Sequence, residues 1–372
     1  MSDHVKLSEV CEILNSNVDK KTKENEQKVK LCNFIDVYNN WAITKYTSKK
    51  FMTATATQNE INKFSLKKGY VAITKDSETK DDIGISTYIA DNFDNVLLGY
   101  HCTLLKPNQK VLNGKFLNAY LSSFYGRKYF SNCASGSGQR YTLTIDIIKD
   151  LTIPLINIET QQKIARTLSV LDQKIENNHK INELLHTLAY KIYEYYFKYK
   201  PKNAKLEQII IENPKSSIMV KNAQKTQDKY PFFTSGDNIL SYPKAIIDGR
   251  NCFLNTGGNV GIKFYVGKAS YSTDTWCICA NEFSDYLYLL LSSIKTHINQ
   301  SFFQGTSLKH LQKNLLKKYP IYMPSTHEIK KFNQIIMPLL TLISINTRTS
   351  KKLEQIRDFL LPLLLKQQVK PQ

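Results

Sequence analysis

The sequence predicts an α+β chain in which two similar, globular, strand-rich domains are separated by two long antiparallel coiled-coil helices, making a pseudo-twofold internal repeat. Three observations predict this fold. An apolar stripe of helical period occurs twice at a constant offset, the same order of turns precedes each stripe, and the upstream regions are rich in Tyr, Phe, Thr, Ile and Val. The length of 372 residues suits two domains of ordinary size.

The two long helices are predicted by apolar residues at steps of three and four, which form one face of a helix. A helix of about 35 residues is about 50 Å long, and a stripe of that length is hidden best against a matching partner. Asn178 interrupts the first stripe, and Asn346 interrupts the second at the same place. The positions expected to pack between the helices are Ile164, Leu168, Leu171, Ile175, Asn178, Leu185, Leu188, Phe332, Ile336, Leu339, Ile343, Asn346, Leu353 and Ile356.

The segments before the two stripes share one order of local structure. Each reads as a glycine loop, a short helix, a strand and a proline-marked turn, with Gly138 and Pro154 in the first and Gly305 and Pro324 in the second. We therefore place the first strand-rich domain at residues 1–157 and the first long helix at 158–200. The second domain follows at 201–325, and the second long helix at 326–372.

The charge of the chain points to a polyanionic partner. The formal net charge is +19 and the pI is about 9.4, which favours nucleic acid. A Lys-rich genome would raise the pI in the same way without any DNA. The excess is spread along the chain rather than confined to a tail, which suits an extended binding surface better than a basic arm.

Seven cysteines at irregular spacing, with no CxxC pair, predict reduced thiols of a cytosolic protein rather than a disulfide framework or a metal site. The first residues carry no apolar signal segment, and no run of about 18 apolar residues predicts a membrane span. We find no catalytic residues: Walker and GxGxxG loops are absent, and Asn213-Pro214 lacks the second proline and aromatic residue of a base-methylating site.

Several segments resemble type I restriction–modification specificity subunits. Residues 153–188, including the run 161–165, look like the first conserved spacer of that family, and residues 353–365 look like its second spacer. Residues 249–261 resemble one of the family's target-recognition domains. The pieces together span nearly the whole chain. Ile156-Asn157 and Ser325 stand where the family usually has a second proline, which affects only where each helix begins.

This resemblance implies a chain that recognises a split double-stranded DNA sequence, with one half read by each target-recognition domain. It implies that the spacer helices set the gap and dock two modification subunits, which carry an S-adenosylmethionine-dependent adenine methyltransferase. Restriction subunits that use ATP and Mg would join the same complex. The chain itself would hold no cofactor or metal, would be non-catalytic, and would act in a prokaryotic cytoplasm for defence against foreign DNA.

Contacts to DNA need Lys or Arg for phosphates, and Arg, Lys, Asn, Gln, Ser or Thr for base edges. Exposed loops are expected at residues 47–53, at 135–141, and at the equivalent segment 304–310, and a tight turn is expected at 256–261. The candidate DNA-binding residues are Lys49, Lys50, Thr53, Ser137, Gln139, Arg140, Gly258, Asn259, Lys263, Gln304, Thr306, Ser307, Lys309 and His310. For each of them a solvated surface is the competing interpretation.

Two other functions remain open from the residues alone. One is a coiled-coil adaptor that binds proteins and is basic only by composition. The other is a self-contained DNA methyltransferase or nuclease whose motifs are unrecognised. DNA recognition predicts an affinity that falls steeply with salt, which the adaptor does not.

Overall fold

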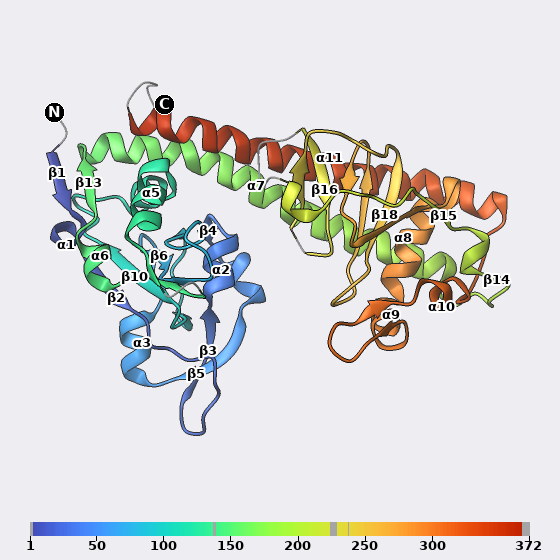
Figure 1. Cartoon of the computed structure of the whole chain (residues 1–372), viewed down its shortest axis with the longest axis horizontal. Coiled ribbons are helices and arrows are strands. Elements are labelled where there is room, and N and C mark those ends of the chain that lie inside the picture. Colours follow the sequence, from blue (N-terminus) through green and yellow to red (C-terminus); the bar gives the residue numbers. More distant parts are fainter. Residues whose placement is uncertain (1–2, 137–138, 224–228, 237, 367–372) are drawn as a thin grey trace. The chain divides into compact units, whose positions relative to one another are not determined.

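The computed structural model describes residues 3–136, 139–223, 229–236 and 238–366 (Figure 1). The chain splits into two compact units. The first unit comprises residues 1–173 and 356–372, and the second comprises residues 174–355. Two long helices, α7 (Ile158–Tyr193) and α11 (Thr326–Leu365), each contribute one segment to each unit.

The first unit is built on a five-stranded sheet. Its strand order is β2 (Cys11–Asn15), β10 (Cys102–Pro107), β6 (Val71–Thr74), β8 (Ser86–Ile89) and β4 (Ala42–Ile43). Neighbours in this sheet are antiparallel, except that β4 runs parallel to β8. A second sheet has the order β5 (Met52–Ala56), β3 (Gln27–Cys32) and β9 (Val96–Leu98), with β9 parallel to β3. β1 (Asp3–Lys6) pairs with β13 (Thr152–Leu155), the strand directly before α7.

The helices of the first unit cover this sheet and close its core. They are α1 (Leu7–Val10), α2 (Phe34–Asn39), α3 (Gln58–Phe64), α4 (Gly114–Ser122), α5 (Phe124–Cys133) and α6 (Ile145–Lys149). Phe116 on α4 and Phe130 on α5 are buried in one cluster with Ile164 of α7 and Leu361 of α11. The long helices therefore form part of the domain core.

The second unit repeats four of the five strands of the main sheet in the same order and has no counterpart of β4 among its described residues. Its main sheet has the order β15 (Ile211–Glu212), β21 (Thr275–Cys279), β18 (Arg250–Asn255) and β19 (Ile262–Val266), all antiparallel. Its smaller sheet has the order β17 (Leu240–Tyr242), β16 (Tyr230–Phe233) and β20 (Ser270–Tyr271), with β20 parallel to β16. β14 (Ala204–Lys205) pairs with β24 (Pro320–Ile321), the strand before α11. The α+β class and the internal repeat are thus confirmed.

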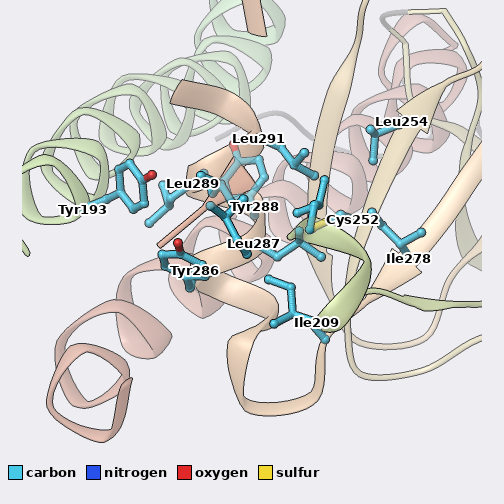
Figure 2. Packing of buried hydrophobic residues seen from close by; sticks show 14 of the residues in the cluster. Tyr193, Ile209, Cys252, Leu254, Ile278, Tyr286, Leu287, Tyr288, Leu289 and Leu291 are labelled. Atoms are coloured by element: carbon cyan, nitrogen blue, oxygen red, sulfur yellow. The ribbon is translucent and has the colours of Figure 1, made fainter. Parts of the chain in front are cut away.

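The core of the second unit is rich in aromatic side chains. Figure 2 shows Tyr193 of α7 beside the residues of α8 (Ser284–Ser293), with Cys252 and Leu254 of β18 on the other side of that helix. The rings of Tyr286 and Phe197 meet edge to face, with centroids 5.2 Å apart. Aromatic pairs of this geometry add about 0.5–1.5 kcal/mol beyond the burial of their area. The shorter helices α9 (Lys295–Ser301) and α10 (Lys313–Lys317) complete the unit.

The long helices run antiparallel where they meet within each unit. In the second unit, Asn178 donates to Ser350 and Asn182 lies against Thr347, so the residue numbers rise along one helix as they fall along the other. In the first unit, the guanidinium of Arg357 lies 3.6 Å from the carboxylate of Asp172. This order of contacts confirms the predicted antiparallel pairing.

The residues expected between the helices occupy three kinds of environment. Ile164, Leu168, Phe332, Ile336 and Ile343 are buried, but they also pack into the domain cores. Leu171, Ile175, Asn178, Leu185, Leu339, Asn346 and Leu353 are half-buried. Leu188 and Ile356 are 49% and 39% exposed, so the expected packing does not extend to them. Buried residues follow both positions along their helices, Tyr193 after Leu188 and Leu361 after Ile356, so the exposure is local.

All seven cysteines are unpaired thiols, and five of them are buried. Burial raises the pKa of Cys11 to about 12, which keeps this thiol protonated and unreactive at neutral pH. None of the described helices combines the length and the apolar composition needed to cross a membrane.

Candidate nucleic-acid interface

A short β-ribbon lies at one end of the main sheet in each unit. In the first unit it is formed by β11 (Ser135–Gly136) and β12 (Tyr141–Thr142), and β12 also pairs with β7 (Asp76–Ser77). In the second unit it is formed by β22 (Phe303–Gln304) and β23 (His310–Leu311), and His310 bridges to Gly257. Each ribbon carries one of the predicted glycine loops.

Backbone hydrogen bonds show that the two ribbons occupy equivalent places. Leu143 N donates to Lys75 O at 2.8 Å, and Leu311 N donates to Thr256 O at 3.0 Å. Lys75 and Thr256 each follow the central strand of their sheet, β6 or β18. The ribbons are therefore anchored to the same edge of the same fold.

Glycine is required in each ribbon by close contact with the returning strand. A Cβ on Gly136 would lie 2.2 Å from Arg140 O, and a Cβ on Gly305 would lie 2.3 Å from Leu308 O. No real Cβ contact is so short, so both positions exclude a side chain. The shared contact also makes Arg140 and Leu308 structural equivalents.

In the first unit the ribbon brings Arg140 against two residues that the sequence reasoning missed. Arg140 Nη2 lies 2.8 Å from His101 Nδ1 and 3.5 Å from Asp76 Oδ2. His101 Nδ1 is itself 2.9 Å from the same carboxylate, and Thr142 donates to its other oxygen at 3.0 Å. The guanidinium of Arg140 is half exposed, whereas the Asp76 side chain is 13% exposed. A buried carboxylate thus orients an accessible cation.

Two lysines stand over aromatic rings beside this cluster. Lys75 Nζ lies 5.7 Å from the ring centroid of Tyr100, and Lys80 Nζ lies 5.5 Å from that of Tyr141. The ring of Tyr100 is in turn packed on that of His101, with centroids 3.8 Å apart. Contacts between cations and rings hold lysines in place at exposed sites at a gain of about 0.5–1 kcal/mol each. Gln139 is exposed on the same loop, and Ser137 lies outside the described residues.

In the second unit two of the predicted segments come together. Gly258 N donates to Lys309 O at 2.9 Å, which joins the turn after β18 to the ribbon loop. Gly258 has a φ of +76°, a left-handed conformation that favours glycine. The exposed candidates gathered here are Asn259, Gln304, Thr306, Ser307, Lys309 and His310. They form a hydroxyl- and amide-rich surface with one lysine.

Lys263, a predicted DNA contact, binds backbone carbonyls of its own unit. Its ammonium donates to the carbonyls of Thr234 at 2.7 Å and Gly236 at 2.6 Å. The side chain therefore holds the segment after β16 in place rather than presenting its charge to solvent. Asn255, buried on β18, adds to this arrangement by donating to Ser235 O at 2.7 Å. A lysine on a strand of an antiparallel sheet gives no sequence signal that separates these roles.

An exposed loop was expected at residues 47–53, but the structure has a 3₁₀ turn followed by a strand there. Residues Thr47–Lys50 form a 3₁₀ turn, because the Thr47 hydroxyl accepts from Thr44 N at 2.9 Å and closes it. Thr53 lies within β5, where it is exposed. Lys49 and Lys50 are exposed at the end of the turn. Thr53 therefore belongs to the smaller sheet, Lys49 and Lys50 belong to the turn before it, and none of the three is part of the ribbon.

The functional residues that sequence reasoning missed are Asp76, His101, Lys75 and Tyr100. Lys75 directly follows β6, Asp76 begins the short strand β7, and Tyr100 and His101 lie between β9 and β10. Their one sequence signal is the polar character of residues 75–82 directly after the apolar strand 71–74. No group of three or more His, Cys, Asp and Glu side chains that could hold a metal ion occurs among the residues for which the structure gives positions.

The fold and these surfaces define a class of protein: a duplicated recognition protein in which each domain presents a ribbon of polar and basic side chains, with long paired helices between the domains. The family model for the type I restriction modification DNA specificity domain matches residues 2–187 and 202–355. The chain belongs to this family, and its two matches coincide with the two strand-rich regions and their adjoining helices.

Individual relatives agree with the family. The chain is 25% identical over 343 residues to the specificity subunit of the type I restriction enzyme MjaIX of Methanocaldococcus jannaschii, which covers 80% of this chain and 74% of that one. It is 30% identical over 149 residues to the HindI specificity subunit of Haemophilus influenzae, covering 40% of this chain and 32% of the relative. The crystal structure of the type I S subunit from M. genitalium shares the fold, with a TM-score of 0.56, 16% identity, and coverage of 98% and 96%.

Proposed function

We propose that this chain is the DNA-specificity subunit of a type I restriction–modification complex and that it reads a split double-stranded target, one half with each domain. The single observation that carries this proposal is the repetition of four sheet strands in one order, β2-β10-β6-β8 and β15-β21-β18-β19, with a ribbon that carries an equivalent glycine in each unit. A two-stranded ribbon fits the major groove of B-DNA, where all four base pairs can be distinguished.

The chemistry of the ribbons supports DNA as the ligand. They expose Arg140 and Gln139 in the first unit and Gln304, Lys309 and His310 in the second. These residue types supply both phosphate contacts and base contacts. The net charge of +19 provides the attraction that brings such a surface to a polyanion.

The remaining chemistry would belong to partner subunits. We propose that two modification subunits bind S-adenosylmethionine and methylate adenine, and that restriction subunits bind ATP and Mg. This chain would be non-catalytic and would position them in a prokaryotic cytoplasm, without a membrane. Support comes from family membership and from a sequence that carries neither a nucleotide loop nor a base-methylating motif.

The decisive experiment is co-expression of the chain with the modification subunit of its own system, followed by genome-wide mapping of methylated adenines. We expect one motif with two short specified halves and a fixed unspecified gap. Omission of this chain should abolish the methylation, and exchange of residues 201–325 should change one half only. Methylation of a continuous motif, or of the same motif without this chain, would refute the proposal.

The same material separates the two other functions. Incubation of the chain alone with labelled S-adenosylmethionine and DNA should transfer no methyl group, whereas a self-contained methyltransferase would label the DNA. A protein adaptor would bind its partners without affinity for DNA, so a filter-binding titration at rising salt distinguishes it from a DNA reader.

A further inference from the structure

We propose that Arg140 is the residue that selects a guanine in the half-site read by the first domain, and that Asp76 and His101 hold its guanidinium in the reading orientation. The inference rests on the proposed function and adds a specificity-determining residue to it. It also assigns different chemistry to the two half-sites, because the equivalent position in the second unit is Leu308, which is 56% exposed.

Accessibility and fixation are combined at Arg140. Its side chain is 54% exposed, yet Nη2 lies 2.8 Å from His101 Nδ1 and 3.5 Å from Asp76 Oδ2. The carboxylate itself cannot turn, since Thr142 donates to Oδ1 from the neighbouring strand and the backbones of Asp76 and Thr142 are paired. The fork of an arginine recognises O6 and N7 of guanine together only when its plane is set beforehand.

The buried carboxylate also argues against a phosphate as the ligand of Arg140. Asp76 lies 3.5 Å from Nη2, so its negative charge offsets that of the guanidinium and repels any anion that Arg140 would bind. A base edge is a neutral acceptor and does not meet this repulsion. Lys75 and Lys80, which have no such carboxylate contact among the described residues and stand over tyrosine rings, are better placed to contact phosphates on either side.

The second unit provides an internal comparison. At the place of Asp76 it has Gly257, because both residues pair with the returning ribbon strand, Asp76 with Thr142 and Gly257 with His310. At the place of Arg140 it has Leu308. The arginine and its orienting carboxylate are therefore both missing there. The second domain must read its half-site without this contact, so loss of Arg140 should change one half-site only.

The test uses the whole complex, with the chain co-expressed with its modification subunit and the methylated sites mapped genome-wide. Arg140→Ala should lower the preference for G·C at one position of one half-site roughly 5- to 150-fold, the effect of one bidentate contact. Arg140→Lys should relax the same position, because an ammonium keeps the charge and loses the fork. The other half-site should stay fully specified, which shows that the variants fold and assemble.

Asp76→Asn tests whether Asp76 orients Arg140, because a merely structural role of Asp76 would not change the preference for G·C separately from affinity. It removes a negative charge beside the DNA, so affinity should stay equal or rise while the preference for G·C falls. Lys21→Ala is the matched control, because this exposed lysine is far from Arg140 in the sequence, and it should leave the motif unchanged. Arg140→Ala should also weaken binding more than Lys21→Ala in a filter-binding assay.

The outcomes are distinct. Arg140→Ala could keep every specified base of the motif while lowering the affinity equally for all sequences. This outcome would make Arg140 a phosphate contact and overturn the inference. So would full specificity in Arg140→Lys, or a first half-site without any G·C pair. If the wild-type complex itself produced no split motif, the proposed function would fail instead, before any variant was compared.

Discussion

Asn346 donates a hydrogen bond of 2.9 Å to Asn182, and one helical turn away Asn178 donates a bond of 3.2 Å to Ser350. The two contacts are copies of each other, because Asn178 corresponds to Asn346 and Asn182 to Ser350 in the internal sequence repeat. The counterpart of each residue thus meets the counterpart of that residue's partner, as in a twofold interface. These four side chains form a polar layer that favours this alignment of α7 and α11 in the second unit.

Loss of this polar layer should be measurable as pairwise coupling. Asn346→Ala leaves Asn182 half-buried without its donor and should destabilise the chain by about 1–2 kcal/mol. Asn182→Ala should cost a similar amount, whereas the double variant should cost less than the sum of the two, with a coupling of about 0.5–1.5 kcal/mol. Urea unfolding of the four proteins measures this coupling, and strict additivity would show that the bond contributes nothing.

The Arg250–Asp285 pair predicts a second stability effect. Arg250 on β18 donates through Nε and Nη2 to both oxygens of Asp285, each at 2.5 Å, and Asp285 is 2% exposed. Arg250 also donates to Thr341 of α11 at 3.0 Å, so it ties the sheet to the long helix. Arg250→Met should lower the free energy of unfolding by about 3–5 kcal/mol, because it strands a buried carboxylate.

The control for that variant removes both charges. The double variant Arg250→Met, Asp285→Leu should be more stable than Arg250→Met alone, since burying a carboxylate without a partner costs more than losing the pair. Urea midpoints of the three proteins give the order. A double variant less stable than the single one would show that packing at Arg250, and not its charge, dominates.

Asp172 should make the stability of the first unit depend on pH. Burial raises the pKa of this carboxyl to about 6, although the charges of Arg357 and Lys115 lower it in part. Neither carboxylate oxygen has a hydrogen-bond partner among the described residues. Because the folded-state pKa exceeds the unfolded value near 3.9, the contribution of Asp172 is fully present below pH 4 and is lost as the pH rises through about 6.

Comparison with Asp172→Asn isolates this group from all other titrations. The free energy of unfolding of wild type relative to the variant should fall by roughly 2–3 kcal/mol between pH 4 and pH 7. Asp94→Asn, at an exposed position, is measured over the same range as the matched control for removing a surface charge. A pH-independent difference for Asp172→Asn would contradict a raised pKa in the folded state.

Gly305 predicts an effect on DNA binding through the ribbon of the second unit. Its φ of +143° and the contact of a Cβ with Leu308 O at 2.3 Å both oppose a side chain. Gly305→Ala should distort the loop and lower specific affinity about tenfold, equivalent to 1.4 kcal/mol. Gly249→Ala is the control: its φ is +91° with open space around it, so it should reduce stability and leave DNA binding unchanged.

Lys309 should contribute to the salt dependence of binding. It is exposed on the ribbon loop, where its backbone carbonyl is held by Gly258 N and its ammonium faces solvent. Lys309→Ala should reduce the slope of log affinity against log salt by about 0.9, the value for one phosphate contact. Lys263→Met should leave this slope unchanged, because that ammonium binds the carbonyls of Thr234 and Gly236. Equal slopes for wild type and Lys309→Ala would place this lysine away from the DNA backbone.

Much of the architecture was predictable because the long helices carry a local signal. Residues such as Ile164 and Phe332 repeat at helical spacing, and apolar periodicity reports directly which face is buried. The stripe did not predict that Leu188 and Ile356 are exposed, because buried residues such as Ala189 and Leu361 follow them on the same helices and only the folded units show which positions are covered. Proline and glycine residues located the short strands before each helix, but they did not show which strands these pair with. The structure pairs β13 with β1 and β24 with β14.

The sequence by itself determined that this protein is a duplicated α+β chain with two long paired helices, since periodicity and an internal repeat are properties of neighbouring residues. Only the tertiary structure decided which side chains form the surface at each ribbon. Asp76, His101 and Arg140 come from three separate segments that strand pairing brings together, and the register of those pairs sets where each side chain lies. Contacts between distant segments leave no period in the sequence, so the equivalence of Arg140 and Leu308 became visible only through backbone bonds and a glycine contact.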